Sequence, residues 1–153
     1  MTGFLLSAHV IAAILAVGPV AVAASMFPAA ARAAAASENP GAVRVLHRIT
    51  RVYAAVGIAV PVFGVATGAS LGVLTDGWLL ASIVLTAAAA ALLIAGVLPG
   101  QSRTLAALEE ARHDVLDRIS RRVAGHTGAF NLLWAIVVVL MIYRPGSTTG
   151  VGL

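Results

Sequence analysis

The chain has 153 residues, of which 60% are hydrophobic and only 10% are charged, and its mean hydropathy is +0.99. Soluble domains are about 45–50% apolar and about 25% charged, so this composition excludes a soluble globular protein and predicts that lipid covers most of the surface. The chain contains no cysteine, which excludes disulfides, thiolate metal sites and thiol nucleophiles. The net charge is +4, and the arginines that produce it follow a membrane pattern, described below, so we do not expect nucleic acid as a partner.

Four uncharged, apolar segments follow one another along the chain. A helix needs roughly 20 apolar residues to cross the hydrocarbon of a bilayer, and each segment is long enough to do so. The sequence therefore predicts an all-α fold, a four-helix transmembrane bundle embedded in the lipid bilayer, with spans at about 4–28, 52–74, 77–99 and 123–143. We expect a single domain over residues 1–144, followed by a flexible tail, 145–153, that is rich in Gly, Ser and Thr.

The arginines predict the orientation of these spans. Nine of the ten lie in two alternate loops: Arg32, Arg44, Arg48 and Arg51 between the first and second spans, and Arg103, Arg112, Arg118, Arg121 and Arg122 between the third and fourth. By the positive-inside rule both loops are cytoplasmic, which puts both termini outside a bacterial plasma (inner) membrane. Arg144 is the one exception. At the membrane surface, Arg44, Arg48, Arg51, Arg118, Arg121 and Arg122 are expected to reach toward anionic headgroups.

The loop before the fourth span has a helical pattern of its own. Its apolar residues form a stripe of Leu105, Leu108, Leu116, Ile119 and Val123. Two i,i+4 pairs, Asp114 with Arg118 and Asp117 with Arg121, have the orientation that supports a helix. We therefore expect an amphipathic cytoplasmic helix that lies on the membrane or caps the bundle. At the other inner loop, residues 38–41 predict a turn after an extended, kinked first helix.

Small and polar residues within the spans indicate helix packing. Gly64, Gly68 and Gly72 recur every four residues, so one face of the second span can approach another helix closely. The partner helix can belong to the same bundle, to a second copy in a homo-oligomer, or to another subunit of a membrane complex. Asn131 lies inside the fourth span and is expected to hydrogen-bond across helices.

His9 is the ionisable residue deepest in a predicted span, about 8 Å inside the outer end of the first. One interpretation is a neutral imidazole bonded to another helix, and the alternative is a haem ligand. The other histidines, His47, His113 and His126, lie toward the inner side. No carboxylate falls within a span, which argues against a carboxylate-driven transporter.

Residues 4–13 (FLLSAHVIAA), with Gly18, resemble the opening helix of a family of small predicted integral membrane proteins of unknown function. A more distant similarity is to membrane-embedded protoporphyrinogen oxidases and copper-resistance membrane domains. In the oxidases the early histidine, here His9, implies haem ligation, together with a lysine near the tryptophan that corresponds to Trp78. This chain has Ala81 and Ser82 in that region and contains no lysine.

These observations support three hypotheses of function. The first is a non-catalytic accessory or scaffold subunit, because no catalytic constellation is complete. The second is a haem-binding or electron-transfer protein that uses His9. The third is a small-solute transporter, which the absence of intramembrane carboxylates disfavours.

Overall fold

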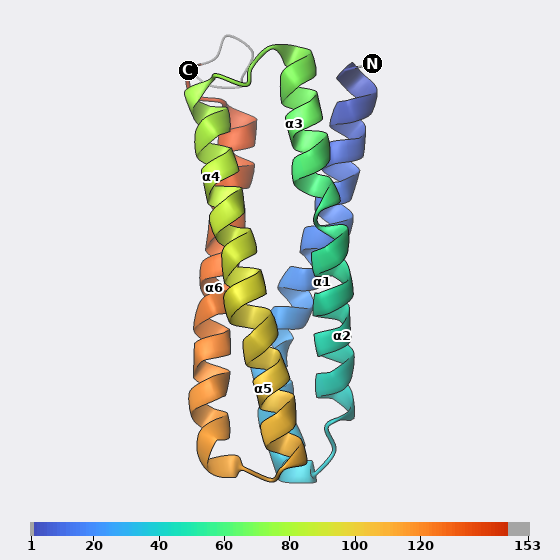
Figure 1. Cartoon of the computed structure of the whole chain (residues 1–153), viewed down its shortest axis with the longest axis vertical. Helices are drawn as coiled ribbons and strands as arrows, with labels where there is room; N and C mark the ends of the chain where they lie inside the picture. Colours follow the sequence, from blue (N-terminus) through green and yellow to red (C-terminus); the bar gives the residue numbers. More distant parts are fainter. Residues whose placement is uncertain (1, 147–153) are drawn as a thin grey trace.

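The computed structural model describes residues 2–146, and within them the chain forms helices joined by turns. Four long apolar helices run side by side as a bundle (Figure 1), so the predicted all-α four-helix arrangement is confirmed. In chain order the elements are α1 (Thr2–Ser37), α2 (Gly41–Val56), α3 (Ala59–Leu71), α4 (Gly77–Ala91), the π-helix η1 (Leu92–Val97), α5 (Leu98–Glu109) and α6 (His113–Tyr143). Helices α2 and α3 together form the second transmembrane rod, and α4, η1 and α5 form the third.

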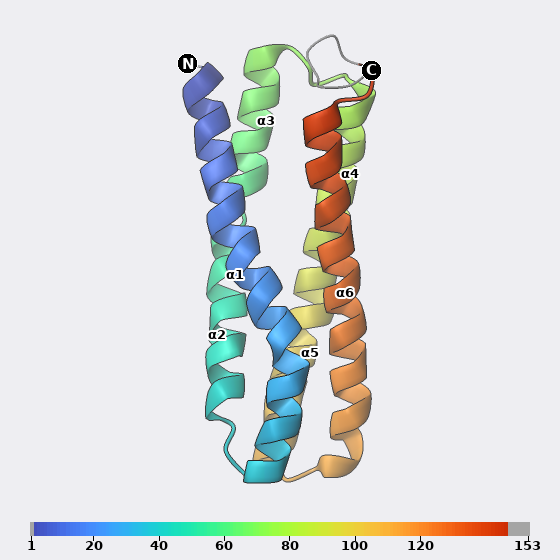
Figure 2. The same ribbon diagram turned by 180° about the vertical axis from the view of Figure 1, so that it is seen from behind.

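The helices extend beyond the predicted spans at one end of the bundle. With 36 residues, α1 is about 54 Å long, whereas the hydrocarbon of a bilayer is about 30 Å thick. The excess lies at the end that carries the α1–α2 and α5–α6 turns, opposite the start of α1, the end of α6 and the α3–α4 turn (Figure 1). The α1–α2 turn occupies residues 38–40, as predicted. Pro19 and Pro28 both lie within α1, which changes direction along its length (Figure 2).

The amphipathic segment before the fourth span differs from the expectation. It is not one helix, because α5 ends at Glu109, Ala111 adopts a positive φ of 53°, and α6 begins at His113. The apolar stripe is thereby divided between the end of the third rod and the start of the fourth. Its residues pack inside the bundle against α1 and α2, in a cluster of Phe27, Ala34, Val43, Leu105, Leu108, Ile119 and Val123. The hairpin buries Leu116 and Val123 and partly buries Leu105, Leu108 and Ile119, so the stripe closes the end of the bundle as two helices instead of one.

Prolines account for the two irregular stretches in the second and third rods. Pro61 has no N–H to offer the carbonyl of Gly57, and its ring crowds that carbonyl, so the helix is interrupted between α2 and α3. The N–H of Val60 bonds to Gly57 O instead, at 3.1 Å. In the third rod Pro99 follows η1, where the N–H of Leu98 bonds five residues back to Leu93 O. Such π-turns are a common accommodation of a locally disrupted helix.

Candidate functional site

His9 is anchored to the second rod by its own hydrogen bond. Its Nδ1 lies 2.9 Å from the carbonyl oxygen of Val60, which can only accept, so Nδ1 carries the proton. A Cβ added at Gly64 would lie 3.0 Å from Cε1 of the imidazole, so the ring rests directly on the backbone of α3. Ser82, which lies in the region where the oxidases have a lysine, donates to Trp78 O in its own helix. The partner of His9 is therefore another helix of the same chain.

The three glycines of the second span have separate surroundings. Gly64 makes room for the His9 ring, as described above. A Cβ at Gly68 would lie 2.9 Å from Cδ2 of Leu79, on the neighbouring third rod. Gly72 follows the end of α3 with a φ of 70°, and a Cβ there would meet nothing within 4 Å. In this structure Gly72 terminates a helix in the left-handed conformation that glycine adopts without strain.

A second pair of glycines permits the closest contact between the third and fourth rods. Gly96 and Gly100 are four residues apart, on η1 and α5. A Cβ at Gly96 would lie 2.8 Å from Nδ1 of His126, and one at Gly100 only 2.5 Å from Cγ2 of Val123. The small-xxx-small spacing, which favours close helix contact in membranes, was present in the sequence but was not identified there.

A buried polar network links α2 to α5 near the arginine-rich end. Gln101 and Thr50 are both 0% exposed. The Nδ1 of His47 lies 3.1 Å from Gln101 Oε1, the Gln101 amide donates to Thr50 Oγ1 over 3.3 Å, and Thr50 donates to Leu46 O over 2.9 Å. With Nδ1–H as donor, Nε2 of His47 can accept from the Ser102 hydroxyl, 3.4 Å away. The network therefore satisfies its buried polar groups with a neutral imidazole.

Polar atoms on α6 are less completely satisfied. Asn131 donates from Nδ2 to Ser25 Oγ on α1, at 3.1 Å, which links two helices. Within the part of the chain that the structure describes, three buried atoms have no hydrogen-bond partner: His126 Nδ1, Thr127 Oγ1 and Asn131 Oδ1. Each unsatisfied buried polar group costs about 1–3 kcal/mol, so this stretch of α6 is less stable than its apolar packing alone implies.

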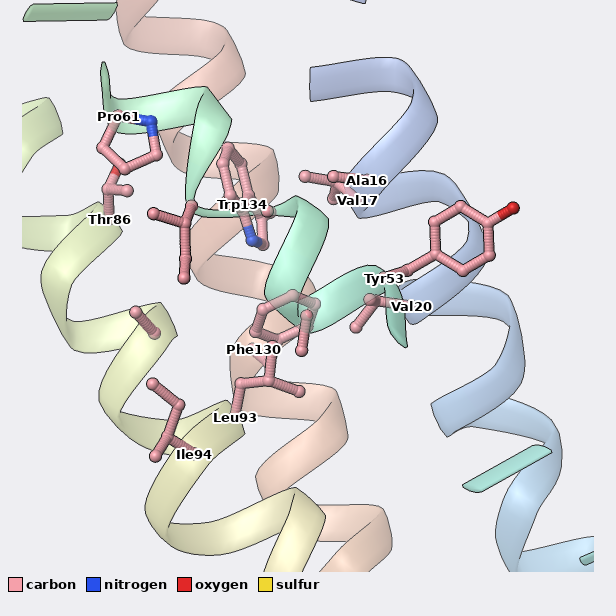
Figure 3. Close-up of a pocket in the computed structure, with 14 residues that line it drawn as sticks. Ala16, Val17, Val20, Tyr53, Pro61, Thr86, Leu93, Ile94, Phe130 and Trp134 are labelled. Atoms are coloured by element: carbon pink, nitrogen blue, oxygen red, sulfur yellow. The ribbon is translucent and has the colours of Figure 1, made fainter. Parts of the chain in front are cut away.

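An apolar crevice of about 170 Å³ lies in the middle of the bundle. Its walls come from all four rods, and Figure 3 shows Phe130 and Trp134 of α6 facing residues of α1, α3 and η1 across it. Ile58 and Ile94 belong to the lining yet are 67% and 64% exposed, so the crevice opens to the outer surface between the second and third rods. Tyr53 and Thr86 are the lining residues that carry hydroxyl groups, and the Tyr53 hydroxyl points away from the crevice (Figure 3).

Exposed arginines surround the end of the bundle that carries the α1–α2 and α5–α6 turns. The six predicted surface residues, Arg44, Arg48, Arg51, Arg118, Arg121 and Arg122, are all exposed. Arg44 pairs with Glu109 on α5 at 2.8 Å, which ties the ends of the second and third rods together. Arg144 lies at the opposite end, where its guanidinium carbon sits 5.3 Å from the centre of the Trp78 ring. This cation–π contact gives the one exceptional arginine a structural role.

The resemblance to the oxidases is only partly matched around His9. Its Nδ1 is bonded to Val60 O, and the lysine that accompanies the early histidine in the oxidases has no counterpart, since the chain has no lysine. No histidine lines the mid-membrane crevice. Among the side chains that the structure describes, which do not include that of His113, no three His, Asp or Glu residues come together as a metal site.

Residues 4–145 match a family described as predicted integral membrane protein (DUF2269). The chain belongs to this family. It is an integral, multi-pass membrane protein, with the lipid bilayer as its surroundings. No curated protein and no solved structure matches it.

Proposed function

We propose that this DUF2269 protein is a non-catalytic accessory or scaffold subunit of a membrane assembly. The observation that carries the proposal is the use made of its polar side chains. His9 binds Val60 O, and His47, Gln101 and Thr50 bind one another, so groups with catalytic potential hold helices together. The crevice, in contrast, has an almost wholly apolar lining. A scaffold needs a rigid bundle with accessible lipid-facing surfaces, and these features supply both.

The partner can be another subunit or a second copy of the chain. The test is to extract the protein in a mild detergent and to measure the protein mass of the particle by light scattering. We expect a mass above the 15.4 kDa of one chain. A single-chain particle in detergents that preserve other membrane complexes would contradict an accessory or scaffold role.

Orientation and location belong to the same proposal. We infer that the arginine-rich end faces the cytoplasm of a bacterium, with both termini outside the inner membrane. Its support is the positive-inside rule, since Arg144 is the only arginine at the end that carries the termini. Reporter fusions after residues 40, 75, 111 and 146 test it. A periplasm-dependent reporter that is active at 40 and 111 but inactive at 75 and 146 would reverse the orientation.

Haem binding through His9 is the alternative, and one observation favours it. The hydrogen bond engages Nδ1 and leaves Nε2 without a partner among the described residues. Ligating histidines commonly donate from one ring nitrogen to a carbonyl and use the other as ligand. A visible spectrum of the purified protein separates the two functions. A stoichiometric Soret band that disappears in His9→Gln would replace the scaffold proposal with the haem alternative.

A further inference from the structure

The crevice at mid-membrane has the size and chemistry to hold a segment of hydrocarbon chain. Its volume of about 170 Å³ is similar to that of an apolar cavity of about 150 Å³ that binds benzene. Its mouth lies between the second and third rods, at Ile58 and Ile94. An α-helix, about 10 Å wide with its side chains, does not fit such a space, whereas part of an acyl chain does.

The second rod places two arginines below this mouth at headgroup depth. Arg51 lies on α2, seven residues before Ile58, which puts it about 10 Å nearer to the arginine-rich end along the rod. Arg51 is also 20 residues from Leu71, the outer end of α3, a distance of roughly 30 Å that matches the hydrocarbon thickness. Arg48 is one turn further along, and both side chains are exposed.

These two charges are not compensated within the described residues, where neither Arg48 nor Arg51 has a carboxylate within 4.0 Å. Arg44, by contrast, is paired with Glu109. On the third rod the nearby surface carries the Ser102 hydroxyl, which contacts His47 Nε2 at 3.4 Å. The surface below the mouth therefore offers two uncompensated cations, which suit a phosphate group, whereas the Ser102 hydroxyl is already directed at His47.

We propose that this surface is a binding site for an anionic phospholipid of the leaflet at the arginine-rich end. Its phosphate lies between Arg48 and Arg51, and one acyl chain enters the crevice past Ile58 and Ile94. A second copy of the chain is a poorer occupant, because a two-fold contact would bring the same uncompensated arginines face to face. The proposal is independent of the scaffold role, since it concerns the lipid and not a protein partner.

Trp134 lines the crevice, so quenching of its fluorescence by a brominated acyl chain measures occupation of the crevice. The chain has two tryptophans, so Trp78→Phe leaves Trp134 as the only tryptophan, which is excited selectively at a wavelength that tyrosine does not absorb. This protein is reconstituted into phosphatidylcholine vesicles that contain increasing fractions of brominated phosphatidylglycerol or, separately, brominated phosphatidylcholine. Each arginine beside the headgroup should favour the anionic phosphatidylglycerol over the neutral phosphatidylcholine by about fivefold. We expect phosphatidylglycerol to reach half-maximal quenching at a mole fraction about five- to twenty-five-fold lower than phosphatidylcholine.

Two pairs of exposed arginines give a matched comparison. Arg48→Gln with Arg51→Gln should bring quenching by phosphatidylglycerol to the level of phosphatidylcholine. Arg118→Gln with Arg121→Gln removes the same charge from α6 and should leave the preference intact. Because all four side chains are exposed, these variants should keep the fold.

Ala90 also lines the crevice, so Ala90→Phe should reduce quenching by both lipids. The proposal is overturned if the two lipids quench equally in the protein with native arginines. It is also overturned if both arginine pairs lower the preference equally, which would show attraction to the whole charged end, or if Ala90→Phe leaves quenching unchanged.

Discussion

Replacement of Gly100 by alanine tests the glycine position at which an added Cβ would approach a neighbouring side chain most closely among the described residues. The new Cβ would lie 2.5 Å from Cγ2 of Val123, about 0.9 Å inside the 3.4 Å at which ordinary contacts begin. Val123 is 1% exposed and packs in the cluster that contains Phe27 and Val43, so it has little space to move into. Its branched side chain is also stiff at χ1. The overlap must therefore be relieved by moving α5 away from α6.

The expected change in the free energy of unfolding is the sum of two opposing effects. Overpacking a filled core costs about 1–3 kcal/mol, and the size of this overlap with a stiff neighbour places Gly100→Ala in the upper half of that range. Alanine in place of glycine within a helix recovers up to about 1 kcal/mol. We therefore expect a net loss of about 1–2 kcal/mol. For a chain of this length, that corresponds to a fall in Tm of about 2–8 °C.

The assay is thermal unfolding of the purified protein in one detergent, followed by circular dichroism. Gly128→Ala is the matched control, because a Cβ at Gly128 on α6 would meet nothing within 4 Å, and its Tm should stay level or rise. Adding Val123→Ala to Gly100→Ala removes the overlapping methyl group, so the double variant should lose less than the sum of the single losses. The reasoning fails if Gly100→Ala is as stable as Gly128→Ala, or if the two losses simply add.

Three further predictions concern the other contacts. Gly68→Leu should lower the melting temperature in detergent or change the particle size, because two leucine side chains occupy that space; unchanged melting and chromatography would remove this contact. His9→Gln should keep most of the stability, since an amide can still donate to Val60 O, and a loss as large as that of His9→Leu would contradict this. Gln101→Leu leaves the N–H of His47 without its acceptor and should cost about 1–3 kcal/mol in thermal unfolding; a neutral effect would show that the network is not stabilising.

The sequence was sufficient for the bundle because lipid restricts the choices so strongly. A segment of about 20 apolar residues must form a helix there, since its backbone groups have no water to bind. The helix ends were less predictable. The end of the first helix was an exception, because its extension through the alanine-rich segment to a turn at residues 38–41 was expected, and α1 continues to Ser37. The break at residues 110–112 fell inside a pattern that suited one helix as well as two.

The buried contacts were harder to predict, because periodicity identifies a helix face but not the surface that meets it. Three glycines in the second span share a spacing of four, yet they meet His9, Leu79 and nothing within 4 Å. Gly96 and Gly100 are also four residues apart, but Pro99 between them suggests the end of a helix and not a packing face. The link between Gln101 and Thr50 joins residues 51 positions apart, and single-sequence patterns carry no information on such pairs.

One feature of the sequence does indicate where the bundle is open. Proline removes a backbone hydrogen bond, a costly change in lipid unless the local backbone rearranges. Pro19 lies among crevice-lining residues of α1, Pro61 lines the crevice itself, and Pro99 follows the π-helix that supplies Ile94. The second and third rods are thus irregular next to the same space, while α1 changes direction but remains one helix. Regular helices can pack along their whole length, whereas displaced turns in neighbouring rods leave unfilled volume between them, so the prolines locate the crevice in the sequence.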